Sequence, residues 1–145
     1  ALLSAANVPA TVIRFGGIYG PTRNALIRRV TSGATVQTQP PKYTNRIHQD
    51  DCVGVLQFII SQTEQNAQID DCYVAVDSDP AEEAIVYEWL AQQLGVDAPT
   101  PSPADSFASQ NKRCRNNRLL AAGYTFKYPS FRDGYADILA SASAE

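Results

Sequence analysis

The segment VIRFGGIYGPTRN, residues 12–24, constrains the fold of this chain more than any other stretch. Its β-branched and aromatic residues predict a strand over Thr11–Phe15, which Gly16 and Gly17 bring to an end. The small and apolar residues of Ala1–Ala6 predict the last turns of a helix. A helix, a short loop and a strand in this order predict the closing part of a βαβ crossover in a mostly parallel sheet.

Hydrophobic periodicity predicts the remaining elements and an α/β chain. A length of 145 residues is enough for one domain around a single core. Helices are predicted over Asn24–Ser32, about Asp51–Gln62, Asp79–Leu94, Asn116–Ala122 and Phe131–Ala142. Strands are predicted near Thr35 and over Cys72–Val76, and the proline-rich stretch Asp97–Gln110 is predicted to be an irregular linker or lid.

Local capping signals refine three of these helices. The helix over Asp51–Gln62 has apolar residues on more than one face, which predicts that it is mostly buried, with Asp50 or Asp51 as its cap. Asn116 is the predicted cap of the short helix that follows it. Ser130 and Asp133 form the predicted capping pair of the last helix.

The glycines of residues 16–20 invite comparison with a dinucleotide-binding fingerprint, but their spacing does not match it. The motif G-x-G-x-x-G is absent, and no acid follows a second strand about 20 residues later. What Gly16 and Gly17 permit is the close approach of the backbone to a flat ligand at the end of a strand. In open α/β sheets, ligands bind at that end.

The charges are distributed unevenly along the chain, although the net charge is only −3. All the basic residues lie in Arg14–Arg46 or in Lys112–Arg132, and the span between them carries acids only. If the two basic segments converge, they form an electropositive cleft for an anion; the alternative is a solvated surface of scattered charge. Arg23, Arg46 and Arg113 come from three separated segments, and their guanidinium groups suit a diphosphate or a carboxylate.

Several other kinds of site are disfavoured. The three cysteines are widely spaced and His48 is the single histidine, so no zinc pattern can be drawn and buried free thiols are expected. His48 has two readings, a general base or a hydrogen-bonded structural residue. The acidic total argues against nucleic acid, and no apolar run is long enough for a membrane span, so we expect a cytoplasmic protein. The first residue, Ala1, and the lack of methionine suggest that translation starts upstream.

Four groups of residues together carry a resemblance to a known family. They are RFGGIYGP at residues 14–21 followed by Arg23, NRIH at residues 45–48 with Asp51, KRC at residues 112–114 with Asn116 and Leu119, and the stretch from Gly123-Tyr124 to Tyr128-Pro129. In order and spacing, nearly the whole chain resembles the C-terminal half of the extended short-chain dehydrogenase/reductases, the NAD-dependent epimerase/dehydratases.

This resemblance implies a fold and a division of the chain. The fold is the C-terminal part of a Rossmann-like parallel sheet with a small α/β substrate-binding subdomain. Residues 1–33 are implied to form the last helix and strand of the Rossmann-type sheet with the following helix, and residues 34–145 the subdomain. An N-terminal Rossmann half is the implied partner, and the helix over Asp51–Gln62 could also pack in a homodimer.

The resemblance also implies ligands for particular residues. NAD or NADP is the implied cofactor, contacted by Phe15, Gly16, Gly17 and Ile18. Tyr19, Arg23, Asn24, Arg46 and Arg113 are implied to face a small anionic substrate such as a nucleotide sugar. No catalytic residue and no metal ligand is expected in this chain, because the glycine-rich phosphate loop and the Tyr-x-x-x-Lys pair of the family are not found in it.

Two departures from the family pattern leave an alternative open. Gly17 and Thr44 stand where many nucleotide-sugar enzymes have asparagine and arginine. The alternative is a non-catalytic module on the same fold that binds a dinucleotide or a metabolite.

Overall fold

The computed structural model describes residues 10–103 and 111–142. Its strands form three parallel pairs: β1 (Val12–Phe15) with β5 (Cys72–Ala75), β2 (Gly17–Tyr19) with β4 (Arg46–His48), and β3 (Thr35–Gln37) with β6 (Thr100–Ser102). The helices are α2 (Ala25–Thr31), α3 (Gln49–Glu64), α4 (Glu83–Leu94), α5 (Asn117–Ala121) and α6 (Phe131–Ala142). The predicted α/β class is confirmed, whereas the predicted helix at Ala1–Ala6 lies outside the described residues.

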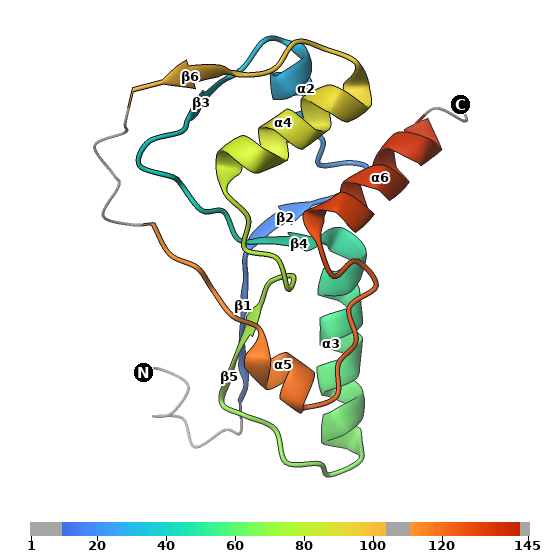
Figure 1. Cartoon of the computed structure of the whole chain (residues 1–145). Helices are drawn as coiled ribbons and strands as arrows, with labels where there is room; N and C mark the ends of the chain where they lie inside the picture. The colour runs from blue at the N-terminus through green and yellow to red at the C-terminus, as the bar shows by residue number, and fades with distance from the viewer. Residues whose placement is uncertain (1–9, 104–110, 143–145) are drawn as a thin grey trace.

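The elements divide between two ends of the molecule, as Figure 1 shows. The upper part contains α2, α4, β3 and β6, and the lower part contains β1, β5, α3 and α5. The short β2–β4 pair lies between them, and α6 runs beside its end. Among the described residues, no helix combines the length and the apolar character needed to cross a bilayer.

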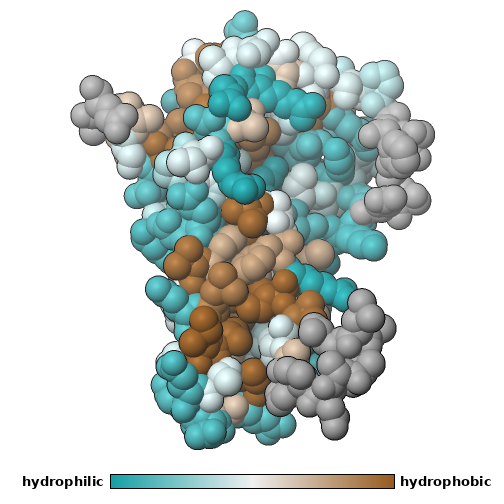
Figure 2. Space-filling model, turned by 180° about the vertical axis from the view of Figure 1, so that it is seen from behind, coloured by the Kyte–Doolittle hydropathy of each residue, from teal (hydrophilic) through white to brown (hydrophobic). Residues whose placement is uncertain are grey.

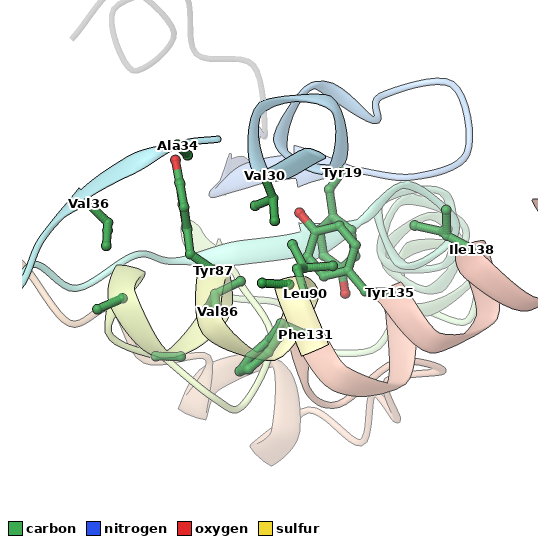
Figure 3. Close-up of a cluster of buried hydrophobic side chains, with 13 residues drawn as sticks. Tyr19, Val30, Ala34, Val36, Val86, Tyr87, Leu90, Phe131, Tyr135 and Ile138 are labelled. Carbon is green, nitrogen blue, oxygen red and sulfur yellow. The ribbon is translucent and has the colours of Figure 1, made fainter. Parts of the chain in front are cut away.

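The buried apolar side chains form two clusters, whereas the sequence predicted one core. The upper cluster contains Tyr19, Val30, Ala34, Val36, Ala81, Ala84, Val86, Tyr87, Leu90, Ala91, Phe131, Tyr135 and Ile138 (Figure 3). The lower cluster contains Ile47, Cys52, Val55, Ile59, Tyr73, Ala75, Leu119 and Phe126. Residues from both sides of the predicted boundary after position 33 pack against each cluster.

The predicted ends of two helices are confirmed in detail. Gly95 follows the last residue of α4 with a φ of 65°, a left-handed conformation that costs glycine little. At the start of α6, the Ser130 hydroxyl donates to Asp133 Oδ2 at 2.6 Å, and the Ser130 backbone N–H donates to the same oxygen at 3.0 Å. These bonds form the expected capping pair, and they fix where the last helix begins.

Both predictions for α3 were wrong. Its N-cap is His48, whose Nδ1 accepts a hydrogen bond from the Asp50 backbone N–H at 3.2 Å. The helix is also only half covered, because Val53, Leu56 and Ile60 are 55%, 44% and 58% exposed. Their spacing of three and four residues places them on one face of the helix, and no described element covers that face.

The carboxylate of Asp51 has a different role from the predicted cap. It is buried, and it accepts hydrogen bonds from the Tyr124 hydroxyl at 2.9 Å and from the backbone N–H groups of Lys127 at 2.8 Å and Tyr128 at 2.9 Å. Asp51 therefore holds the loop between α5 and α6 against the start of α3.

Helix α4 begins at Glu83, later than the predicted start at Asp79. The reason is a backbone pairing with the segment before β4: Thr44 N–H donates to the Ala81 carbonyl at 2.9 Å, and Glu83 N–H donates to the Lys42 carbonyl at 2.7 Å. Residues held in this bridge are extended, so they cannot form the first turn of a helix. Asp79 instead accepts a hydrogen bond from Arg132 at 3.1 Å.

The predictions for Asn116 and for Asp97–Gln110 were also partly wrong. Asn116 precedes α5, but its side chain makes no capping bond and donates instead to the Val76 carbonyl at 3.0 Å and to Ser78 Oγ at 3.1 Å.

Within the stretch predicted to be irregular, β6 pairs with β3 and places Pro101 opposite Val36. Proline is tolerated there because the strand lies at an edge. Residues 104–110 lie outside the described residues.

Candidate ligand-binding site

A cavity of about 370 Å³ opens beside β2, where the chain leaves the lower part of the molecule for α2. Its walls come from β2, from the start of α2, from the segment before β4 and from α6. The lining residues are Gly17, Ile18, Tyr19, Arg23, Ala25, Leu26, Tyr43, Thr44, Asn45, Arg46 and Tyr135. This described lining contains two arginines and no carboxylate, so the cavity is suited to an anion.

The glycine segment that the sequence presented as a turn is strand β2, paired in parallel with β4. Gly16 must be a glycine for packing, because a Cβ atom there would lie 2.8 Å from the Asn45 carbonyl oxygen and from the Val76 side chain. Gly17 differs: it is exposed, and its Cβ would meet only the Asn45 carbonyl oxygen, at 3.4 Å. Of the two, Gly17 is the one whose backbone is open to a ligand.

The structure brings five of the predicted ligand residues to this cavity, namely Gly17, Ile18, Tyr19, Arg23 and Arg46. The others lie elsewhere. Phe15 packs against the lower cluster, and Gly16 is enclosed by its neighbours. Asn24 lines a separate hollow between α2, α4 and α6, and its Oδ1 accepts a hydrogen bond from Arg28 at 2.8 Å.

The predicted site residue Arg113 reaches the edge of the cavity indirectly. Its guanidinium carbon lies 4.1 Å from the centre of the Tyr43 ring, and Tyr43 is part of the lining. A cation over an aromatic face is attracted by the negative face of the ring. Arg113 therefore contacts a residue of the cavity lining without being part of the described lining itself.

Arg46 forms the floor of the cavity and is 9% exposed. Its Nη1 donates a hydrogen bond to the Thr44 hydroxyl, which itself donates to the Ala81 carbonyl at 3.0 Å. The residue that departs from the family pattern, Thr44, thus has a structural role. It orients the buried guanidinium of Arg46.

Burial disfavours the charged forms of two acidic groups, the carboxyl of Asp77 and the hydroxyl of Tyr19. Burial raises the pKa of Asp77 to about 7, opposed by the hydrogen bond from the Asp79 backbone and by the positive charge of Arg46. The pKa of the Tyr19 hydroxyl is raised above its ordinary value, first by burial and then by Asp77. Neither the Tyr19 hydroxyl oxygen nor Asp77 Oδ2 has a hydrogen-bond partner among the described residues.

His48 fits the structural reading rather than the general-base reading. It is 1% exposed, it caps α3, and it packs between the rings of Tyr19 and Tyr128 at centroid distances of 5.3 and 4.1 Å. Burial lowers its pKa, opposed by the nearby Asp50 and Asp51. A neutral imidazole in this position accepts the capping hydrogen bond from the Asp50 backbone.

The cysteines are free, as expected, but only Cys52 is fully buried, whereas Cys72 and Cys114 are partly exposed. Burial raises the pKa of the Cys52 thiol to about 11, and the neighbouring Asp51 adds to the effect. Cys52 is therefore a packing residue rather than a nucleophile. In the part of the chain that the structure describes, no group of three or more His, Cys, Asp or Glu side chains could hold a metal ion.

The sequence did not single out Tyr43, Asn45 or Tyr135 as members of the site. Tyr135 lies on the buried face of α6, and its stacking on Tyr19 at a centroid distance of 4.5 Å joins residues 116 positions apart. Figure 3 shows the two rings side by side. Periodicity predicts which face of a helix is buried, but it carries no information about which distant residue that face meets.

Comparison with solved structures finds this fold in larger proteins. A Methylobacillus flagellatus protein, provisionally named an NAD-dependent epimerase/dehydratase, is 30% identical with a TM-score of 0.78, over 98% of this chain and 50% of that chain. A protein of unknown function from Silicibacter pomeroyi is 29% identical with a TM-score of 0.82, over 97% and 52%.

A more distant structure is the UDP-N-acetylglucosamine 4-epimerase from Bacillus cereus. It is 12% identical with a TM-score of 0.76, over 97% of this chain and 50% of that chain, and this likeness shows the fold alone. The chain spans about half the length of the solved structures that it matches. No family model and no curated protein matches it.

Proposed function

From the premise that this chain has the fold of the C-terminal half of the NAD-dependent epimerase/dehydratases, we propose that it is the substrate-binding half of such an enzyme. The proposed substrate is a nucleotide sugar or a related anionic metabolite. The proposed reaction of the whole protein is hydride exchange between a substrate carbon and a nicotinamide.

The observation that carries the proposal is the charge of the cavity beside β2. Arg23 and Arg46 come from different segments and line it together, with no carboxylate among the described lining residues. Guanidinium groups hold phosphate oxygens by paired hydrogen bonds and keep their charge at any working pH. A volume of about 370 Å³ is within the usual range for small-molecule sites.

NAD or NADP is the proposed cofactor, and Gly17 is the residue that fits it best. The backbone of Gly17 is exposed at the edge of the cavity and has no side chain to keep a flat ring away. When bound, the nicotinamide would supply the hydride acceptor or donor. Gly17 and Ile18 would position one side of that ring, and Arg23 would hold the anionic part of the substrate.

The proposed partner is an N-terminal half that carries the phosphate loop of the cofactor site and the catalytic tyrosine. Uncovered apolar surface in the lower part of the molecule supports it: Val12 of β1 and Val53, Leu56 and Ile60 of α3 are all more than 40% exposed. Figure 2 shows apolar side chains gathered over this lower region. In addition, β1 pairs with β5 alone among the described strands, although parallel sheets are normally covered on both faces.

The substrate part of this proposal can be tested by titrating the chain with uridine diphosphate at low and at moderate salt. We expect binding that weakens as salt rises, because the ligand is held by cations near the surface. Arg23→Gln should weaken it about tenfold, the scale of a lost charged hydrogen bond. Arg14→Gln is the matched control, since Arg14 is exposed on β1 away from the cavity lining. Binding that ignores both salt and Arg23→Gln would contradict the proposal.

The catalytic part is tested by assaying the chain alone. With NAD or NADP and a set of UDP-sugars, we expect no turnover, because the described lining of the cavity contains no histidine, aspartate, glutamate, lysine or cysteine to act as a general base. Turnover by the 145 residues alone would overturn the division of labour between the two halves. The non-catalytic module on the same fold would be favoured if the residues upstream lack a Tyr-x-x-x-Lys pair.

A further inference from the structure

The segment of residues 111–114 crosses the rim of the cavity without helix or strand, and two asparagine side chains tie it down. Asn45 Nδ2 donates to the Lys112 carbonyl at 2.8 Å, and Asn45 Oδ1 accepts from the Cys114 backbone N–H at 2.6 Å. In the opposite direction, Asn111 Oδ1 accepts from the Tyr43 N–H at 2.7 Å, and its Nδ2 donates to the Pro41 carbonyl at 2.6 Å.

The hydrogen bonds of Asn45 flank one residue, Arg113. The Asn45 amide fixes the backbone immediately before and immediately after it, while Asn111 fixes the backbone of Tyr43, on whose ring the Arg113 guanidinium lies at 4.1 Å. The ring itself is held at its far end, where the Tyr43 hydroxyl donates to Glu82 Oε1 at 3.0 Å. An exposed arginine would otherwise sample many rotamers.

Asn45 also lines the cavity, next to Arg46. The backbone carbonyl of Asn45 accepts a hydrogen bond from the Gly17 N–H at 2.8 Å. One residue therefore connects the open glycine edge, the floor arginine and the segment that bears Arg113. Its amide supplies one donor and one acceptor in a fixed geometry, which is what two backbone groups on either side of a residue require.

We propose that Asn45 is a positioning residue that holds Arg113 against Tyr43 as the third cation of the anion site. This rests on the proposed function of the cavity. Both polar atoms of the Asn45 side-chain amide already bind the backbone of residues 112–114. Its effect on a bound anion passes through Arg113, whose charge is presented from a fixed place and loses little freedom on binding.

The test is a double-mutant cycle on uridine diphosphate binding, with Asn45→Ala, Arg113→Ala and the pair. Residues that act through one another are not additive. We expect Asn45→Ala to weaken binding about fivefold when Arg113 is present and less than twofold in the Arg113→Ala background. Equal losses in both backgrounds would overturn the proposal, because they would mean that Asn45 acts on the cavity generally.

A second readout needs no ligand. The guanidinium of Arg113 lies over the Tyr43 ring, so the Cδ protons next to it should have upfield NMR shifts in the unmodified chain. Asn45→Ala should move these shifts toward random-coil values. Unchanged shifts would overturn the proposal even if no nucleotide binds, whereas shifts that move in a chain without salt-dependent binding would contradict the proposed function alone. Asn111→Ala removes the reverse tie and gives the same test if Asn45→Ala does not fold. Asn117→Ala, exposed on α5, is the matched control.

Discussion

The upper and lower clusters differ in how completely the chain covers them. The upper cluster is enclosed by α2, α4, α6 and β3, and its members include Phe131 and Leu90, both 0% exposed. The lower cluster is covered on one side by α3 and α5, but Val12, Val53, Leu56 and Ile60 remain exposed around it. The upper cluster is closed on its described sides, whereas exposed apolar side chains surround the lower cluster, and such patches often mark interaction surfaces.

The difference lies in how the strands of each part are covered, because parallel strands are normally covered on both faces. The upper part also contains a parallel pair, β3 with β6, and there α2, α4 and α6 pack with β3 around one core. In the lower part, Val12 of β1 and one face of α3 stay exposed. The cavity lies beside β2, at the junction of the two parts. A ligand held there would lie between the closed upper core and the exposed apolar surface to which we propose that an N-terminal half binds.

The largest expected effect on stability comes from a fully buried side chain of the upper cluster. Phe131→Ala should cost about 3–5 kcal/mol of unfolding free energy, because the ring is fully buried and the cavity left behind cannot collapse. Urea unfolding measures this loss of unfolding free energy. The fluorescence of Trp89 can report it, because the rings of Trp89 and Phe131 meet edge-to-face with centroids 5.7 Å apart.

The matched control for Phe131→Ala is the same substitution on α3. Phe58 is partly buried beside Tyr124, with ring centroids 5.5 Å apart, and Phe58→Ala should cost about 1–2 kcal/mol because part of the ring is already in water. Equal losses at the two positions would mean that the two clusters are equally well covered.

A smaller effect depends on pH and concerns Asp77, at the junction of the two parts. Burial raises the pKa of its carboxyl from 3.8 to about 7, so the native state keeps a proton that the unfolded chain has already released. The stability that this proton contributes is fully present below about pH 4 and is lost as pH rises through about 7. The unfolding free energy of Asp77→Asn relative to that of the unmodified chain should therefore rise by about 2–3 kcal/mol between pH 5 and pH 8. Urea midpoints at each pH measure it, and a constant difference would contradict the assignment.

The sequence predicted the elements whose signals are local. Thr11–Phe15, α2, β5 and the Ser130–Asp133 cap follow from propensity, periodicity and capping within a few residues. The family resemblance then brought Arg23 and Arg46 into one site, and the structure does place both at one cavity. Their roles there stay predictions until a ligand is measured.

What the sequence missed is stabilised by contacts between distant residues. Strands β2, β4 and β6 have three residues each, too few for a period, and exist because a partner strand lies beside them. The sequence gives no sign that the side-chain amide of Asn45 binds the backbone of Lys112 and Cys114, far along the chain. The late start of α4 has the same cause, since pairing with residues 42–44 overrides a strong local start signal.

The smallest expected effect on the unfolding free energy concerns the exposed apolar face of α3. Substituting Val53, Leu56 and Ile60 of α3 by serine should change the unfolding free energy of the chain by about 1.5 kcal/mol or less, because each of these side chains is only partly buried. The same change should reduce binding of a hydrophobic dye and abolish association with the N-terminal half of the Methylobacillus flagellatus protein, used as the partner probe. Gln57→Ser, at an exposed polar position of the same helix, is the control.

A loss of several kcal/mol would show that the α3 face packs within this chain, whereas association that survives the three serines would place the docking surface elsewhere. Self-association that the serines abolish would instead make a second copy of the chain the occupant of this face.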